Sequence, residues 1–147
     1  MIEDVRKILA PVDFSENSQK ILLEAQLLAE KFKAQLVVVF VVQSIDDYSG
    51  FFVPHMPLAQ FEEELLDGAQ NKMKNFLAEN LPDGCESAVL AGDVAFEIID
   101  YAKGNSIDMI VMGTHGYKGL EKVLFGSVAE QVVKNSPCPV LTINPYS

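Results

Sequence analysis

Short apolar runs alternate along this chain with segments of helical periodicity, and this alternation limits the fold more than any other feature. Gln35–Val42 is the clearest run, because it is rich in β-branched residues and does not alternate apolar with polar positions. A strand of that kind is covered on both faces, as in a parallel sheet. Further runs predict strands at Lys7–Val12, Cys85–Leu90, Met109–Met112 and Val140–Ile143.

Helical segments separate the predicted strands. Ser15 is the expected N-cap of the first helix, since its hydroxyl can accept from a backbone N–H of the first turn. Apolar residues recur there at three- and four-residue steps, which is typical of one buried helix face: Ile21, Ala25, Leu28, Ala29 and Phe32. Similar patterns predict helices around residues 61–77, 95–102 and 128–133. Five strands separated by helices predict an α/β fold, an open five-stranded parallel sheet with helices on both faces. In 147 residues, we expect one domain over 1–147.

Charge and composition exclude several classes of function. The formal net charge is −10, from 21 acidic and 11 basic residues, and such a field repels nucleic acid and anionic membranes. The longest apolar run, Leu36–Val42, is too short to span a bilayer, and the first residues lack the apolar region of a signal peptide. Cys85 and Cys138 have neither metal-site nor redox-motif spacing. We expect a soluble, cytoplasmic protein without nucleic-acid or membrane partners.

A glycine pattern predicts an anion site. Gly113-Thr-His-Gly116 follows the fourth strand, and Gly126-Ser127 comes after nine intervening residues, at the start of the last helix. Glycine lets backbone N–H groups approach an anion without a Cβ in the way, and a helix N-terminus attracts phosphate. The pattern matches neither the P-loop, which needs GxxxxGK[ST], nor GxGxxG. Ser127 can cap the helix or bind phosphate; capping alone leaves Gly126 and the two upstream glycines unexplained.

The glycine pattern is expected to face Asp13. Ligands of open parallel sheets bind beyond the carboxyl ends of the strands, where the strand order reverses, and the loops after the first and fourth strands are the obvious pair to flank that crevice. Asp13 is either a turn residue or a ligand of ribose or Mg²⁺. His115 packs, faces solvent or belongs to the binding loop. No carboxylate is near His115 in sequence to orient it as a base, so we assign it to the binding loop.

The chain resembles the universal stress protein family, in the branch with adenine-nucleotide α-hydrolase-like folds. The resemblance rests on the pattern G-x2-G-x9-G-[ST], on the opening Ile8-Leu-Ala-Pro-Val-Asp13-Phe-Ser and on the closing Ser136-Pro-Cys-Pro-Val-Leu141, and it covers essentially the whole chain. Family members that keep this motif bind ATP. The resemblance implies that ATP with Mg²⁺ is held by Pro11, Val12, Asp13, Val41, Met112, Gly113, His115, Gly116, Gly126, Ser127 and Val128.

The resemblance also implies a homodimer formed through Val140–Ile143 and a regulatory role. We expect no catalytic residues, because neither a base constellation nor a Walker lysine is apparent, and hydrolysis needs both a positioned water and charge neutralisation. A slow ATPase and a ligand-free interaction module are the alternatives. Lys118 and Lys122 lie in the insert between the glycines and can contribute cations. A loop as long as 43–57 is often a lid or a partner site; against that alternative, its aromatic residues are expected to pack against the second helix.

Overall fold

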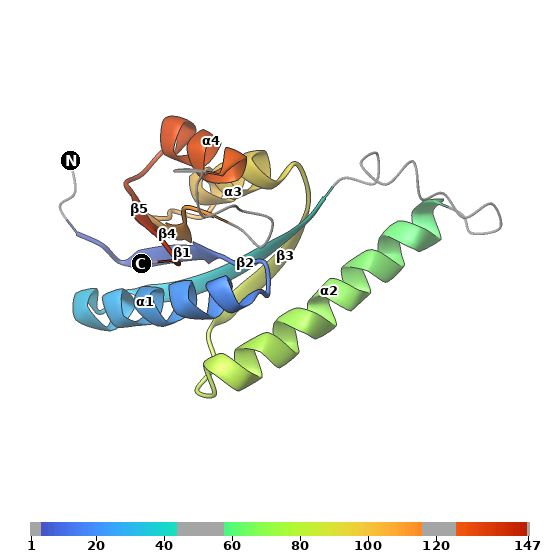
Figure 1. Ribbon diagram of the computed structural model, residues 1–147, viewed down its shortest axis with the longest axis horizontal. Coiled ribbons are helices and arrows are strands. Elements are labelled where there is room, and N and C mark those ends of the chain that lie inside the picture. Colours follow the sequence, from blue (N-terminus) through green and yellow to red (C-terminus); the bar gives the residue numbers. More distant parts are fainter. Residues whose placement is uncertain (1–3, 44–57, 116–125, 147) are drawn as a thin grey trace.

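The computed structural model describes residues 4–43, 58–115 and 126–146, which form one sheet flanked by helices (Figure 1). The elements follow in the order β1 (Lys7–Pro11), α1 (Glu16–Phe32), β2 (Gln35–Gln43), α2 (Leu58–Asn80), β3 (Glu86–Gly92), α3 (Val94–Gly104), β4 (Met109–Gly113), α4 (Ser127–Asn135) and β5 (Val140–Ile143). All strand pairs are parallel, and the five strands are ordered β3-β2-β1-β4-β5. The predicted fold class is therefore confirmed.

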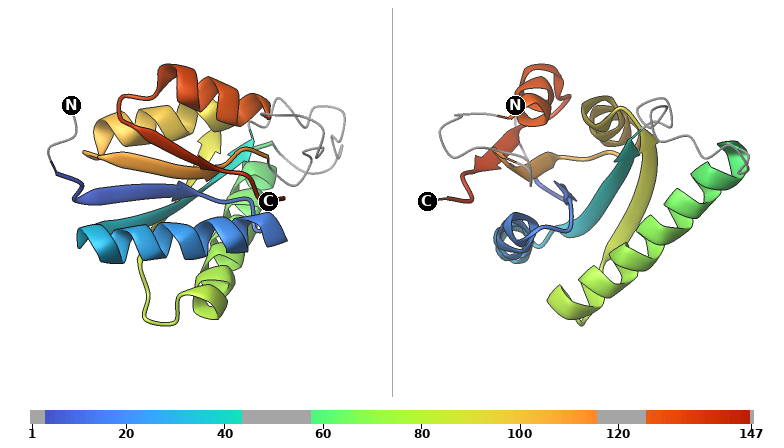
Figure 2. Two further views of the ribbon diagram at one scale, coloured as in Figure 1. Left: turned by 60° about the vertical axis from the view of Figure 1, so that its left-hand side comes forward. Right: turned by 45° about the vertical axis from the view of Figure 1, so that its right-hand side comes forward.

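The sheet is covered on both faces (Figure 2). Helices α1 and α2 pack on one face, over side chains such as Ala10, Val38 and Val111, and α3 and α4 pack on the other, over Val37 and Val39. Since successive strand residues point to opposite faces, a strand buried on both sides must be apolar throughout. This is the reason for the unbroken apolar run in β2.

The first helix begins where the sequence predicts and buries most of its predicted face. Ser15 is the N-cap, and its hydroxyl accepts from the Ser18 backbone N–H. Phe32 was expected on the buried face, but this prediction is wrong because its side chain is 45% exposed. The spacing of apolar residues predicts which face of a helix is buried, but not how far along the helix the burial extends. Phe32 is the last residue of α1, and the following strand begins only at Gln35, which is exposed.

The two cysteines are free and half-buried. Burial raises the pKa of the Cys85 thiol, and the nearby Glu86 carboxylate raises it further. Burial likewise raises the pKa of the Cys138 thiol, against an opposing hydrogen bond from Ser136. Both thiols are thus protonated at neutral pH, which is the state of an unreactive cysteine.

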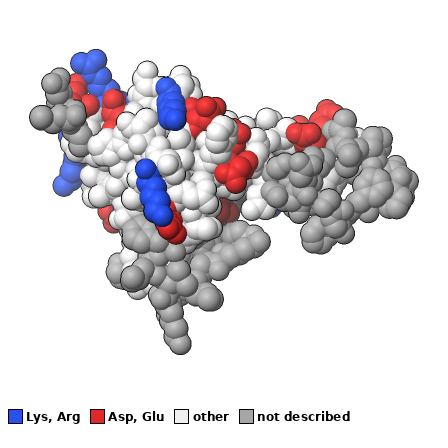
Figure 3. All heavy atoms as spheres, turned by 90° about the horizontal axis from the view of Figure 1, so that it is seen from above, with Lys and Arg blue, Asp and Glu red and all other residues white. Residues whose placement is uncertain are grey.

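Charged side chains are dispersed over the α3 and α4 side of the molecule. In Figure 3, the described lysine and arginine side chains stand apart from one another among acidic ones. Within the described ranges no helix is both long and apolar enough to cross a bilayer.

Candidate functional site

The strand order creates a notch at the carboxyl edge of the sheet. Strand β1 lies between β2 and β4, and its chain leads into α1 on one face, whereas α4 follows β4 on the other face. The β1 ladder ends with Pro11 opposite Val39, but β2 continues to Gln43, which pairs with Gly92 of β3. The backbone beyond Val39 therefore has no β1 neighbour. Such a reversal of strand order is where open parallel sheets bind ligands.

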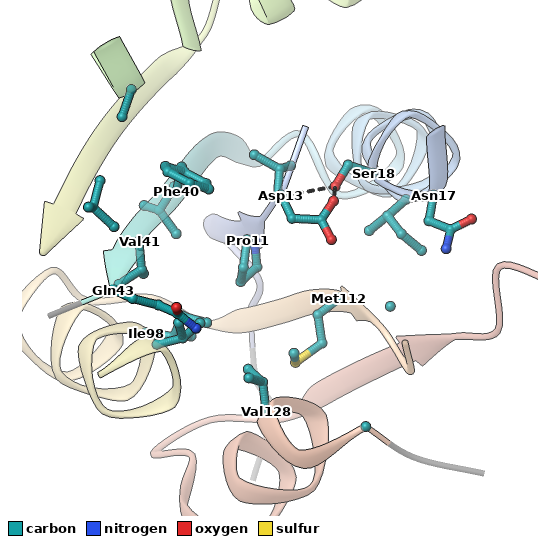
Figure 4. A pocket seen from close by; sticks show the side chains of 18 of the residues that line it. Pro11, Asp13, Asn17, Ser18, Phe40, Val41, Gln43, Ile98, Met112 and Val128 are labelled. Carbon is teal, nitrogen blue, oxygen red and sulfur yellow. Dashed lines mark hydrogen bonds between the residues drawn. The ribbon is translucent and has the colours of Figure 1, made fainter. Parts of the chain in front are cut away.

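A cavity of about 640 Å³ occupies this notch, a volume within the range of small-molecule sites. Its lining includes every described residue that the resemblance assigns to a nucleotide (Figure 4): Pro11, Val12, Asp13, Val41, Met112, Gly113, His115, Gly126, Ser127 and Val128. Gly116, Lys118 and Lys122 lie outside the described residues, and so does nearly all of loop 43–57. Pro11 and Val128, which are 117 positions apart in the chain, thus meet at one site.

Asp13 organises the exit of β1. Its Oδ1 accepts from the Ser15 N–H at 3.0 Å and from the hydroxyls of Ser15 and Ser18, the latter at 2.6 Å. The Ser18 hydroxyl in turn accepts from the Asp13 N–H at 2.8 Å. This network explains Asp13 as a turn residue, and the same side chain lines the cavity. The two interpretations of Asp13 are therefore compatible.

Phe14 makes the bend that turns β1 into α1. Its φ is 66°, a left-handed backbone conformation that costs a residue other than glycine about 1–3 kcal/mol. The ring packs against Phe40 of β2 at a centroid distance of 4.5 Å and against Phe76 of α2 at 5.5 Å. Aromatic packing of this kind offsets the strain and fixes the position of Asp13.

The second wall is built on Thr114 and Gly126. The Thr114 N–H donates to the Ile143 carbonyl at 2.9 Å, and the Thr114 carbonyl accepts from the Gly126 N–H at 2.7 Å. A Cβ at Gly126 would lie 3.3 Å from that carbonyl oxygen, a tight contact with backbone that cannot easily move. Gly126 is therefore needed for the close approach of α4 to the end of β4. Its φ of −70° requires no special freedom.

Gly126, and not Ser127, is the N-cap of α4. The interpretation of Ser127 as a cap is wrong, because Ser127 is the first helical residue and is exposed. Glycine at the cap position has no side chain with which to cap the helix. Ser127 and other residues of the N-terminal turn of α4 line the cavity together with Gly126.

His115 is buried rather than facing solvent. It is 5% exposed, its Nδ1 lies 2.8 Å from Thr114 Oγ1, and its ring contacts that of Tyr146 at 5.5 Å between centroids. His115 still forms part of the cavity wall. The neighbouring hydroxyl of Thr114, which the sequence analysis did not single out, sets the orientation of the ring.

Helix α2 supplies a wall that the sequence analysis missed. Glu64, Gly68 and Lys72 are spaced four residues apart, so they share one helix face, and all three line the cavity. The N-terminal half of α2 reaches past the end of β2 (Figure 1), which brings this face over the notch. Among the described lining residues Lys72 is the sole lysine or arginine. Only the four-residue spacing could have indicated these residues.

The remaining end of the cavity is apolar. Val41, Val94, Ile98, Met112 and Val128 line it, from β2, α3, β4 and α4. Asp13 and Ser18 lie on the other side of the opening from Ile98 (Figure 4), and Ser127 also lines the cavity. Apolar and polar side chains thus line the same cavity, so it can hold a ligand that has both an apolar and a polar part. Described residues contain no group of three or more His, Cys, Asp or Glu that could hold a metal ion.

A family model described as the universal stress protein family matches residues 4–144. The chain belongs to the universal stress protein family. It is 37% identical to universal stress protein MJ0531 of Methanocaldococcus jannaschii, over 94% of this chain and 81% of that protein. Universal stress protein MJ0577 of the same organism is 30% identical, with 94% of each chain covered.

Solved structures of the family share the fold. Universal stress protein UspA from Lactobacillus plantarum has a TM-score of 0.75 and 31% identity to this universal stress protein, covering 97% of this chain and 99% of its own. A universal stress protein solved in complex with cAMP has a TM-score of 0.61 and 18% identity, covering 97% and 99%. At that identity the likeness concerns the fold alone.

Proposed function

We propose that this universal stress protein binds ATP, or another adenine nucleotide, together with Mg²⁺, and that it acts as a nucleotide-dependent regulatory module of the stress response. The observation that carries the proposal is the cavity at the reversal of strand order, whose wall includes every described residue of the predicted nucleotide set. Family membership supports it, since the resemblance to the family predicts these residues from the sequence alone and they line one cavity.

The two ends of the cavity suit the two ends of a nucleotide. The base would lie in the apolar end, against the main chain of Val41, and the ribose would lie beside Asp13. The phosphates would lie at Gly126 and Ser127, where the uncapped N-terminus of α4 attracts anions. Mg²⁺ keeps several of its waters and binds through phosphates with one or two carboxylates, and Asp13 is placed to be one of these.

A regulatory role fits the site better than rapid hydrolysis. Hydrolysis requires a base or a group that positions water, and neutralisation of the γ-phosphate charge. Asp13 Oδ1 already accepts from three donors, which favours a positioning role over that of a general base. A nucleotide would then act through its binding energy, by favouring one arrangement of the dimer or of a partner.

The dimer of this proposal uses β5. Among the described strands β5 is at the edge of the sheet and pairs only with β4, and Leu141 on it is 41% exposed. An uncovered edge strand presents unpaired N–H and C=O groups. A second copy of β5 would satisfy them and cover Leu141.

Binding is tested on the purified full-length protein. The chain has no Trp and four Tyr, so a co-purified adenine would dominate the absorbance at 260 nm, and mass spectrometry of the denatured sample would identify the nucleotide. Added ATP with Mg²⁺ should raise the melting temperature, because a ligand at one hundred times its Kd stabilises by about 2.7 kcal/mol. ADP, AMP and cAMP form the comparison panel. If no nucleotide is released and none raises the melting temperature, the proposal fails.

Ser127→Asp tests the phosphate end without weakening the fold. A carboxylate in the first turn stabilises a helix, but it repels a triphosphate, so the melting temperature without ligand should hold or rise while the ATP-induced shift disappears. Ser106→Asp is the matched control: Ser106 is exposed and precedes β4 at the opposite edge of the sheet, and aspartate tolerates its left-handed φ of 56°. An equal loss of the ATP shift in both variants would point to net charge rather than to a local site.

A further inference from the structure

Gln43 places one carboxamide at the apolar end of the cavity. It is the last residue of β2 and pairs with Gly92 of β3, beyond the end of β1. Because strand side chains alternate between faces, Gln43 points to the same face as Val39 and Val41, which is the face covered by α3 and α4. Figure 4 shows Gln43 beside the same opening as Ile98, Met112 and Val128.

The chemistry of this amide differs from that of its surroundings. Its neighbours at this end are Val41, Val94, Ile98, Met112 and Val128, which carry no polar side-chain group for hydrogen bonding beyond the weak thioether acceptor of Met112. Within the described part of the chain, the Gln43 side chain makes no hydrogen bond. A glutamine amide offers one acceptor and two donors, so a flat ligand in this apolar slot would meet a donor and an acceptor side by side.

The main chain of Val41 offers a second donor and acceptor. Val12 N–H donates to the Val39 carbonyl at 2.9 Å, and the β1 ladder goes no further. In a parallel sheet the N–H and C=O of alternate residues point to the same neighbouring strand. The N–H and C=O of Val41 therefore point to the side that β1 has left, into the notch.

We propose that Gln43 reads the base of the bound nucleotide, as the side chain that selects a 6-aminopurine. The proposal rests on the nucleotide site proposed above. With the N1 edge of adenine on the Val41 main chain, one hydrogen of the 6-amino group donates to the Val41 carbonyl and the other to Gln43 Oε1. Gln43 Nε2 donates to N7, which is the bidentate pairing of a carboxamide with adenine. Guanine presents O6 in place of the amino group, so it can donate to neither acceptor.

The test separates the N7 contact from nucleotide binding as a whole. The dissociation constants of ATP, 7-deaza-ATP and GTP are measured by calorimetry on the full-length wild type and on Gln43→Leu. The wild type should bind ATP about five- to tenfold more tightly than 7-deaza-ATP, which lacks the N7 acceptor. Gln43→Leu should bind ATP more weakly by at least that factor and should no longer distinguish ATP from 7-deaza-ATP.

Gln43→Glu gives an independent reading. A carboxylate still accepts from the 6-amino group but faces the N7 lone pair with an oxygen, so this variant should prefer 7-deaza-ATP to ATP, the reverse of the wild type. Gln70→Leu, on the exposed surface of α2, is the matched control and should keep the wild-type order. If ATP binds and Gln43→Leu still distinguishes the two nucleotides as the wild type does, the role of Gln43 is overturned while the nucleotide site stands. If no nucleotide binds to the wild type, both proposals are overturned.

Discussion

Asp13 collects several donors on a single carboxylate oxygen, and this fixes both a turn and one side of the cavity. The donors are the N–H and hydroxyl of Ser15 and the hydroxyl of Ser18. Ser18 is 5% exposed, and its hydroxyl loses its carboxylate acceptor when Asp13 is replaced by alanine. Hydrogen bonds to charged groups are worth more than neutral ones, and buried groups left without them are costly.

Asp13→Ala should therefore lower the free energy of unfolding even without nucleotide, by about 1–3 kcal/mol. The measurement is the midpoint of urea unfolding at constant slope. Asp100→Ala is the control, since Asp100 is exposed on α3 and a surface substitution should stay within about 0.5 kcal/mol. Equal midpoints for the two variants would show that the Asp13 network contributes nothing to stability.

The role of a single residue can be predicted from the sequence when that role depends on residues close to it in the chain. Ser15 was identified as the N-cap because capping depends on the next three residues. Ser127 was open to two interpretations because its role depends on where α4 begins relative to Thr114, which is twelve or more residues away in the chain. Gln43 was missed for a similar reason. Strand β2 extends beyond the end of β1, and only the register of the strands shows this extension.

Gly68 and Gly92 both lie in regular elements, but they differ in backbone conformation and in the space available for a Cβ. Gly68 lies in the middle of α2, and a Cβ there would meet nothing within 4 Å. Gly92 ends β3 with a φ of 144°, and a Cβ there would lie 2.6 Å from Glu97 Oε1 and 2.9 Å from Glu97 Cγ. The backbone of Gly92 is thus one that other residues rarely adopt, whereas that of Gly68 is an ordinary helix.

The same substitution should have opposite effects at these two positions. Gly68→Ala should raise the free energy of unfolding by about 0.5–1 kcal/mol, because glycine loses more conformational freedom in a helix than alanine. Gly92→Ala should lower it by about 1–3 kcal/mol through backbone strain. Thermal and urea unfolding of both variants beside the wild type give the signs, and two changes of the same sign would contradict this account.

The order of strands in the whole molecule determines where the site lies. The prediction that the loops after the first and fourth strands flank one crevice is supported by the adjacency of β1 and β4. That prediction needed only the alternation of strands and helices with the general rule for parallel sheets. To predict the wall formed by Glu64, Gly68 and Lys72, one would have to know how α2 is tilted across the sheet. No local sequence pattern encodes that tilt.

The proposed dimer is a property of the whole molecule, and Leu141→Lys should convert it to a monomer. Leu141 is exposed in the single chain, so lysine should leave the fold intact, while charge on an edge strand opposes pairing. Light scattering coupled to size exclusion measures the mass. Leu23→Lys, at an exposed apolar position of α1, should remain dimeric. A monomeric wild type at all concentrations would contradict the proposed dimer.

The four pairs that join β2 to β3 beyond the end of β1 have a consequence for how this site tolerates change. At Val41 the groups turned toward the notch are N–H and C=O, and every residue except proline carries both. Replacement of this side chain by another of similar size would leave those groups in place. At Gln43 the side chain itself contacts the base in the proposed complex. At Gly126 the absence of a side chain allows the close approach of α4 to the end of β4. Random mutagenesis should thus find that tolerance to substitution varies along the cavity wall. Val41 should accept other side chains, whereas Gln43, two residues further along the same strand, should not.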